Sequence, residues 1–182
     1  LAATVAIPAA STGSTCASLA ALTIPNLTIK SAEAITAGPF TPPGAQAAMT
    51  VPAFCRVEGT ARPTTDSDIR FEVWIPPVDA WNGKFQGVGN GGYQGPISYT
   101  AMATALRRGY ATASTDTGHT GDDVIFGKGH PEKVIDYGWR AIHVMTDTAK
   151  LIVRNARGRF ADRSYFVGCS TGGHQAMSEV QR

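Results

Sequence analysis

A serine flanked by glycines constrains the fold of this chain more than any other feature of the sequence. The sequence Gly-Cys-Ser-Thr-Gly occupies residues 168–172, after a strand-like segment at residues 164–167 and before a helix-like segment at residues 173–182. Glycines two positions before and after Ser170 remove the Cβ atoms that would clash in a tight strand-to-helix turn. The motif is common by chance in Gly-rich sequences, so its place between a strand and a helix carries the prediction of a nucleophile elbow.

The chain before this turn alternates strand-like and helix-like segments. At residues 69–75 apolar and polar side chains alternate, as in a strand, and two prolines end the pattern. A long helix is predicted where apolar side chains recur at helical spacing between Trp139 and Val153, and it ends near Gly158. The other predicted segments are strands at residues 84–88, 110–114 and 164–167 and a helix at residues 98–108. This alternation predicts an α/β fold with a largely parallel sheet.

Three loops rich in glycine or polar residues follow predicted strands, at residues 89–95, 115–121 and 168–173. Sites in parallel sheets form at the carboxyl ends of strands, so we expect these loops to surround one cleft. The backbone amide of Thr171 is the expected oxyanion donor, because it follows the serine and begins a helix. An amide of Gly91 or Gly92 is the expected second donor.

Cys169 is the alternative nucleophile in this turn. If Cys169 were the nucleophile, the residues two positions before and after it would be Val167 and Thr171, and neither is a glycine. A strained turn centred on the nucleophile therefore favours Ser170.

The histidines do not complete a catalytic triad by their sequence positions. In hydrolases with this elbow the acid and then the histidine follow the serine along the chain. His174 follows Ser170 but lies on the same predicted helix, at the wrong place to meet the serine oxygen. His143 falls in the middle of a helix and is interpreted as structural. His119 and His130 flank the expected cleft, where we expect substrate contact or a role in loop structure.

Residues 1–60 are predicted to be an irregular N-terminal segment with one short strand at residues 22–29, and residues 61–182 to be the α/β part. Prolines punctuate the first segment, at positions 25, 39, 42, 43 and 52. A disulfide between Cys16 and Cys55 would close a loop of about 40 residues, which the chain-entropy model values at about 4 kcal/mol. The alternative is two buried free thiols. Three cysteines cannot all pair with one another, so one is left over.

Composition excludes two classes of function. A formal net charge of +2 on 182 residues does not form a phosphate-binding face, so we expect no nucleic-acid partner. No apolar run reaches the roughly 18 residues that a membrane-spanning helix needs, so we expect no membrane partner. Charged residues make up 16% of the chain, below the roughly 25% usual for soluble domains, which favours a secreted or periplasmic protein.

The two ends of the chain carry their own predictions. The sequence starts at Leu1, and residues 1–10 are small and apolar, as in the tail of a secretory signal or in a flexible mature N-terminus. The final helical pattern, at residues 173–182, has no stop signal after it. Either the terminus is unusually placed or the chain is the N-terminal part of a longer fold.

With these motifs identified, the chain resembles the tannase and feruloyl esterase family, which also includes the enzyme that cleaves mono(2-hydroxyethyl) terephthalate. Five stretches carry the resemblance, in the family's order and together far more specific than the elbow alone. They are Cys55-Arg56-Val57, Gly87-Val88-Gly89-Asn90-Gly91-Gly92, Thr115-Asp116-Thr117-Gly118-His119, Ile135-Asp136-Tyr137-Gly138-Trp139-Arg140-Ala141 and Gly168-Cys169-Ser170-Thr171-Gly172-Gly173.

The resemblance implies a secreted or periplasmic serine esterase, of which this chain is the N-terminal portion of the α/β-hydrolase fold. Ser170 matches the nucleophile. Cys169 matches a cysteine that the family joins by a disulfide to one beside the catalytic histidine, so its partner lies outside this sequence, while Cys16 pairs with Cys55. The catalytic Asp and His, the later strands and the lid, where many members bind calcium, also lie outside it. The residues present imply no cofactor and no metal site.

Two hypotheses follow for function. In the first, the chain belongs to an enzyme that hydrolyses small aromatic carboxylic esters such as gallates, ferulates or terephthalate monoesters, completed by a C-terminal remainder or a separate chain linked through Cys169. In the second, it is a non-catalytic α/β binding or structural module that kept the elbow. Its last strand would then expose an unpaired sheet edge that invites a partner strand or aggregation.

Overall fold

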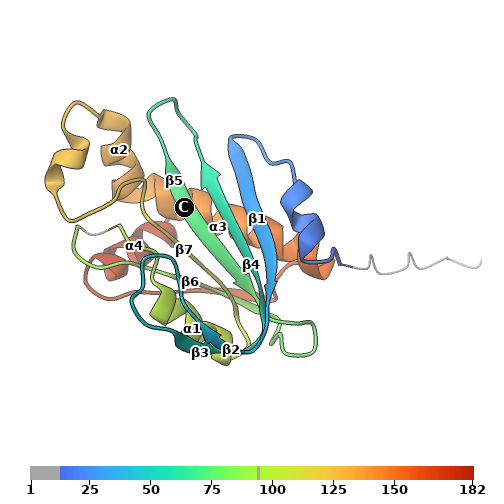
Figure 1. Cartoon of the computed structure of the whole chain (residues 1–182). Helices are drawn as coiled ribbons and strands as arrows, with labels where there is room; N and C mark the ends of the chain where they lie inside the picture. Colours follow the sequence, from blue (N-terminus) through green and yellow to red (C-terminus); the bar gives the residue numbers. More distant parts are fainter. Residues whose placement is uncertain (1–12, 94) are drawn as a thin grey trace, which may run out of the picture.

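A computed structural model describes residues 13–93 and 95–182, which form one twisted sheet covered by helices on both faces (Figure 1). The strands are β1 (Leu27–Ile35), β2 (Gly38–Phe40), β3 (Met49–Val51), β4 (Phe54–Ala61), β5 (Ile69–Ile75), β6 (Lys84–Val88), β7 (Ala111–Thr115) and β8 (Arg163–Val167). The helices are α1 (Tyr99–Arg107), α2 (Pro131–Ile135), α3 (Ala141–Arg157) and α4 (Thr171–Glu179). Shorter helical turns are η1 (Ala17–Ala21), η2 (Val124–Gly127) and the π-helical η3 (Asp136–Arg140).

The described strands form a six-stranded sheet in the order β1-β4-β5-β7-β6-β8, and β2 pairs with β3 in a separate hairpin. The prediction of a largely parallel sheet is wrong, because β1, β4, β5 and β7 pair antiparallel. The two parallel pairs among the described strands are β6 with β7 and β6 with β8. Connectivity accounts for part of this pattern: the short connection at residues 62–68 allows only antiparallel pairing of β4 with β5, whereas the connection from β6 to β7 contains helix α1, and a crossover of this kind permits parallel pairing.

The N-terminal segment is more regular than the sequence pattern predicted. Instead of one short strand at residues 22–29, strand β1 begins at Leu27 and runs to Ile35 along the edge of the main sheet. A register shift between Ile29 and Ser31 breaks the period-two pattern, which hides the strand in the sequence. Strand β4 crosses the proposed boundary at residue 60. The predicted signal-like stretch at residues 1–10 lies outside the described residues.

Elements in the second part of the chain match their predictions closely. Strands β5 and β6 have the predicted bounds, α1 and β7 differ by one residue at both ends, and β8 differs by one residue at its start. Helix α3 ends at Arg157 and is capped by Gly158, whose φ of 70° places it in the left-handed conformation that closes a helix. It begins at Ala141 because the π-helical turn η3 occupies the residues before it.

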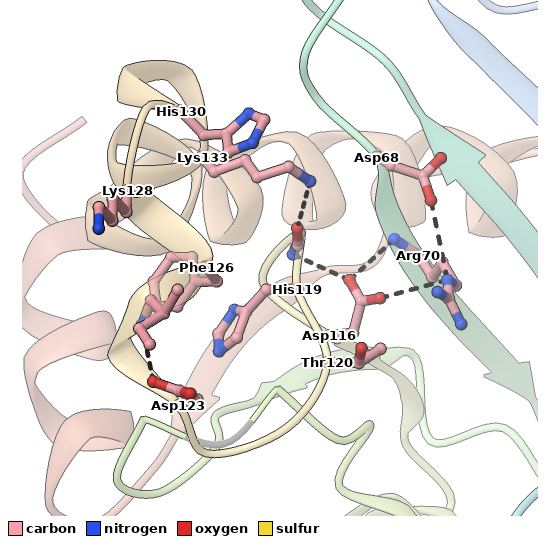
Figure 2. Close-up of a pocket in the computed structure, with 12 residues that line it drawn as sticks. Asp68, Arg70, Asp116, His119, Thr120, Asp123, Phe126, Lys128, His130 and Lys133 are labelled. Carbon is pink, nitrogen blue, oxygen red and sulfur yellow. Dashed lines mark hydrogen bonds and ion pairs between the residues drawn. The ribbon is translucent and has the colours of Figure 1, made fainter.

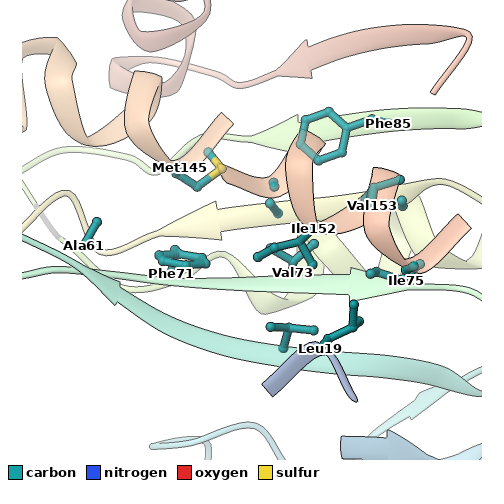
Figure 3. Close-up of a cluster of buried hydrophobic side chains, with 14 of the residues drawn as sticks. Leu19, Ala61, Phe71, Val73, Ile75, Phe85, Met145, Ile152 and Val153 are labelled. Carbon is teal, nitrogen blue, oxygen red and sulfur yellow. The ribbon is translucent and has the colours of Figure 1, made fainter. Parts of the chain in front are cut away.

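The larger core lies between the sheet and α3. Side chains of β5, including Phe71, Val73 and Ile75, face Met145, Ile152 and Val153 of α3 across this layer (Figure 3). Leu19 of η1 packs against the same cluster. The opposite face of the sheet carries a second core, which α1 and the β2–β3 hairpin cover; its buried members are Val51, Phe54, Trp74, Val88, Met102, Ala103 and Leu106.

The predicted disulfide between Cys16 and Cys55 is confirmed, with a Cα–Cα separation of 5.6 Å. It joins the residue before η1 to β4 and so fastens the N-terminal turn to the sheet. At the opposite edge, β8 has β6 as its partner among the described strands, and most of its residues are exposed. Strands β1 and β8 are thus the two edges of the described sheet, and helix α4 follows the carboxyl end of β8 (Figure 1).

Candidate active site

Ser170 occupies a strained turn between β8 and α4, as the glycine-flanked motif predicted. Its φ of 55° and ψ of −123° lie in a region that residues with a Cβ rarely adopt. The side chain is exposed, and the residue directly precedes the first turn of α4. Strain of this kind persists only where the surrounding structure imposes it, and it clusters at functional sites.

The glycines around Ser170 permit a very close approach of backbone segments. A Cβ on Gly168 would lie 2.3 Å from the carbonyl carbon and oxygen of Gly172. A Cβ on Gly172 would lie 2.7 Å from the carbonyl oxygen of Asn90, in the loop after β6. Both positions therefore exclude any larger residue, and the reason given for the glycines from sequence is confirmed.

The two segments predicted to hold an oxyanion adjoin one another. Thr171 is the first residue of α4, where a backbone amide has no acceptor within the helix. The loop after β6 packs on this turn, because a Cβ on Gly89 would lie 2.7 Å from Gly172 Cα. A Cβ on Gly91 would meet no atom within 4 Å, so this part of the loop faces open space. Gly92 has a φ of 60°, a conformation that glycine adopts without strain.

The loop after β7 is also strained, and it contacts the loop after β6. Thr117 has a φ of 59°, which is rare for a β-branched residue. The carboxylate of Asp116 accepts hydrogen bonds from the amides of Arg70 and Gly118, each at 2.9 Å, and holds this turn in place. His119 Nε2 donates to the carbonyl oxygen of Tyr93 at 2.5 Å, which joins this loop to the loop after β6.

A cavity of about 500 Å³ opens beside the loop after β7, and Asp116, His119 and Arg70 are among its lining residues (Figure 2). Ser170 does not line it. Burial raises the pKa of Asp116 to about 7, against the opposing effect of the hydrogen bonds from Gly118 and Arg70. Within this lining, Asp116 Oδ1 accepts the hydrogen bonds from the two amides, and Asp116 Oδ2 lies 3.5 Å from Arg70 Nε (Figure 2).

Three of the four histidines have structural partners. His119 is 7% exposed, and its ring also stacks on Phe126, so it organises loops, one of the two roles expected from sequence. His130 contacts Asp66 at 2.8 Å. His143 lies 3.3 Å from Glu179, which agrees with a structural role. His174 is exposed on α4. Within residues 13–93 and 95–182, no histidine hydrogen-bonds to the Ser170 hydroxyl.

Two residues that sequence reasoning missed lie at the centre of the site. Asn90 precedes the expected oxyanion glycines, and Gln175 lies on α4; their side chains are hydrogen-bonded to each other. Both are buried. The available signal was a polar side chain five positions after the nucleophile, on a helix that must pack against the sheet.

Cys169 is a free, exposed thiol among the described residues. The same residues contain no group of three or more His, Cys, Asp or Glu side chains arranged to hold a metal ion. None of the described helices has the length and apolar character required to cross a bilayer.

Comparison with known proteins agrees with this arrangement. A family model described as tannase and feruloyl esterase matches residues 55–182. An uncharacterized esterase of Xanthomonas campestris pv. campestris is 44% identical over 175 residues, which cover 95% of this chain and 30% of that protein. A probable feruloyl esterase B-1 of Aspergillus oryzae is 36% identical over 129 residues, covering 71% of this chain and 24% of that protein.

Solved structures give the same result. The crystal structure of feruloyl esterase B from Aspergillus oryzae matches with a TM-score of 0.85 and 32% identity, over 91% of this chain and 34% of that chain. Tannin acyl hydrolase from Aspergillus niger matches with a TM-score of 0.68 at 23% identity, over 87% of this chain and 31% of that chain, and so supports the fold alone. The chain spans about a third or less of the length of these relatives. Since the family model covers most of the sequence, the chain belongs to the tannase and feruloyl esterase family.

Proposed function

We propose that Ser170 is the nucleophile of a serine esterase, and that the full-length protein hydrolyses carboxylic esters of aromatic acids through an acyl-enzyme. The observation that carries the proposal is the backbone of Ser170, whose φ of 55° occurs between a strand and a helix. A turn of this kind exposes the hydroxyl above the sheet and puts the next amide at the start of a helix. Relatives named as esterases support the same reaction class.

In the acylation step, Ser170 Oγ attacks the ester carbonyl carbon while a histidine takes the hydroxyl proton. The carbonyl oxygen becomes an oxyanion, which accepts hydrogen bonds from the amide of Thr171 and from that of Gly91 or Gly92. The helix dipole of α4 favours negative charge at the same position. Collapse of the intermediate breaks the bond to the alcohol, which leaves with the proton from the histidine.

In the deacylation step, water attacks the acyl-enzyme and the same groups act in reverse. The histidine takes a proton from the water, and the two amides hold the second oxyanion. When the bond between Ser170 Oγ and the acyl carbon breaks, the histidine returns that proton to Oγ and the carboxylic acid leaves. These steps use a hydroxyl, an imidazole and water, so the proposal invokes no cofactor.

The histidine and its aspartate belong, in this proposal, to sequence beyond these 182 residues. All four histidines of the chain have other positions or partners, as described above. The curated relatives are about three to four times longer than the segment matched, which leaves room for both groups. Cys169, exposed next to the nucleophile, would bond to a cysteine in that remainder and tie the turn to the histidine's loop.

A location outside the cytoplasm, in the periplasm or the medium, is part of the same proposal. Its support is the disulfide between Cys16 and Cys55, because disulfides persist mainly in oxidising compartments.

The test is the Ser170→Ala variant of the full-length protein, assayed with a p-nitrophenyl ester. We expect turnover to fall by at least about 1,000-fold, since removal of a triad member leaves only the contributions of binding and the oxyanion site. Wild-type rates in this variant would overturn the assignment of Ser170. Rates on methyl gallate, methyl ferulate and a terephthalate monoester then identify the acid that the protein prefers.

The alternative function, a non-catalytic module, is tested by mass. Intact masses of the purified protein with and without reductant report whether Cys169 is bridged. A bridge to a further segment supports the esterase, whereas a free Cys169 in a stable 19.1 kDa monomer supports the module.

A further inference from the structure

We propose that the side chains of Asn90 and Gln175 form a positioning pair that sets the distance between the two oxyanion-binding segments. The inference rests on the proposed function of Ser170 and deepens it. Neither side chain would touch the substrate. Asn90 would act through the amides of the glycines that follow it, and Gln175 would act through the amide of Thr171, which precedes it on α4.

The pair is joined by two hydrogen bonds in opposite directions. Gln175 Oε1 accepts a hydrogen bond from the backbone amide of Asn90 at 3.1 Å. Gln175 Nε2 donates to Asn90 Oδ1 at 3.0 Å. Gln175 is 1% exposed and Asn90 is 6% exposed. Buried polar groups in such a pair keep one geometry, because each group left without a partner would carry the full cost of desolvation.

The rest of the Asn90 side chain is fixed as well. Its Nδ2 donates to the carbonyl oxygen of Thr115 at 2.8 Å and to that of Pro96 at 2.9 Å. Carbonyl oxygens only accept, so the amide group has one orientation, with Nδ2 toward these carbonyls and Oδ1 toward Gln175. Asn90 therefore connects three segments: the end of β7, the loop after β6 and helix α4.

The position of this pair explains why it would matter for chemistry. Asn90 directly precedes Gly91 in the chain, and Gln175 lies one helical turn beyond Thr171 on α4. A helical turn is rigid, so a hydrogen bond to Gln175 fixes the loop relative to the Thr171 amide. Gly172, which lies against the Asn90 carbonyl, sets how closely the two segments can approach. The hydrogen bonds hold them at that distance.

Oxyanion stabilisation depends on donors that are in place before the charge develops. A displacement of about 1 Å at a catalytic group can lower the rate by about 100-fold. A pair that served only packing would affect stability, whereas a positioning pair affects kcat with little change in KM. This difference separates the two roles experimentally.

The experiment compares Gln175→Met and Gln175→Glu in the full-length protein, with Ser170→Ala and Gln86→Met as references. Gln175→Met keeps the length of the side chain and loses both hydrogen bonds. We expect its kcat for p-nitrophenyl acetate to fall by about 10- to 100-fold, with KM within about threefold of the wild type. Gln86→Met makes the same change at a buried glutamine on β6, and its kcat stays within about twofold of the wild type.

Gln175→Glu tests the positioning role through the pH dependence of kcat, which a role in packing alone would not change. The introduced carboxylate still accepts from the Asn90 amide, but it can donate to Asn90 Oδ1 only when it is protonated. We therefore expect the ratio of its kcat to the wild-type kcat to rise as the pH is lowered from 8 to 5. This nearly isosteric variant also serves if Gln175→Met fails to fold.

The outcomes separate this inference from the proposed function. If Ser170→Ala is inactive while both Gln175 variants keep kcat within about twofold of the wild type, the positioning role is wrong and the nucleophile stands. A pH-independent loss in Gln175→Glu, matched by an equal loss in Gln86→Met, also overturns the positioning role. Full turnover in Ser170→Ala contradicts the proposed function itself and removes the basis of the inference.

Discussion

Gly172, two residues after the nucleophile, lies in direct backbone contact with Asn90, 82 positions earlier in the chain. A Cβ on Gly172 would lie 2.7 Å from the Asn90 carbonyl oxygen and 3.4 Å from Gly89 Cα. The contact involves backbone atoms on both sides, so a larger residue cannot be accommodated by a side-chain rotation. The first turn of α4 and the loop after β6 are therefore held together at the closest distance that their backbones allow.

The first prediction concerns this contact. Gly172→Ala should separate the two segments, lowering kcat of the full-length protein by about 10- to 100-fold and the free energy of unfolding by about 1–3 kcal/mol. Gly173→Ala is the matched control, since its Cβ would lie 3.7 Å from the nearest atom, the Gly168 oxygen. Alanine favours a helix over glycine by about 1 kcal/mol, so the control should be neutral or more stable. Urea unfolding and steady-state kinetics distinguish the two; equal behaviour would contradict the prediction.

A second prediction concerns Tyr137, which donates a hydrogen bond to the carbonyl oxygen of Gly92 at 2.9 Å. Tyr137→Phe removes this bond and leaves the ring stacked on Tyr93. We expect the free energy of unfolding to fall by about 0.5–1 kcal/mol, and kcat to fall a few fold because the glycine loop becomes less ordered. Tyr110→Phe removes a hydroxyl that has no hydrogen-bond partner among the described residues, and should leave both quantities unchanged. Stability by urea titration and kcat on a p-nitrophenyl ester test the pair.

The third prediction is a pH dependence of stability at Asp116. Its pKa is raised from the ordinary 3.8 to about 7 in the folded protein, mainly by burial. The folded state therefore binds a proton that the unfolded state has released between about pH 4 and pH 7. The contribution of this group to stability is present below about pH 4 and is lost as the pH rises to 7, by at most about 1.4 kcal/mol per pH unit.

Asp116→Asn tests this sign. Asparagine Oδ1 can still accept from the Arg70 and Gly118 amides, but the side chain no longer ionises. The stability of the variant relative to the wild type should rise between pH 5 and pH 8, measured by urea unfolding at each pH. A constant difference across this range would show that Asp116 does not titrate there.

The fourth prediction concerns the disulfide. Cys16 and Cys55 are 39 positions apart, and a loop of this size corresponds to about 4 kcal/mol in the chain-entropy model. Cys16→Ser combined with Cys55→Ser should lower the free energy of unfolding by roughly that amount. The effect on kcat of the folded protein should be small, because the bond lies between η1 and β4, away from Ser170. Thermal unfolding that is unchanged in the double variant would contradict this account.

Some of the fold could be predicted from sequence because local patterns determined it. The pattern of strand β5 stops at Pro76, and β6 ends just before Gly89, so both have clear limits. Strand β1 was missed because a bulge near Ile29 breaks its periodicity. The direction of strand pairing was also missed, because periodicity identifies a strand without identifying its neighbour.

The features of the candidate site could likewise be predicted from sequence only where local patterns determine them. The turn at Ser170 could be predicted, because steric limits require glycines at fixed positions around it. The positive φ of Thr117 could not, since a β-branched residue is among the last expected to adopt it. The Asn90–Gln175 contact spans 85 positions, and nothing local to either residue names the other.

The central claim is that Ser170 is the residue that the substrate acylates. The most direct measurement is reaction of the full-length protein with a fluorophosphonate, followed by intact mass and peptide mapping. The account predicts one phosphonyl group per protein, on the peptide that contains Ser170, with loss of esterase activity in parallel and no labelling of Ser170→Ala. Labelling at another residue, or esterase activity that survives complete labelling of Ser170, would contradict it.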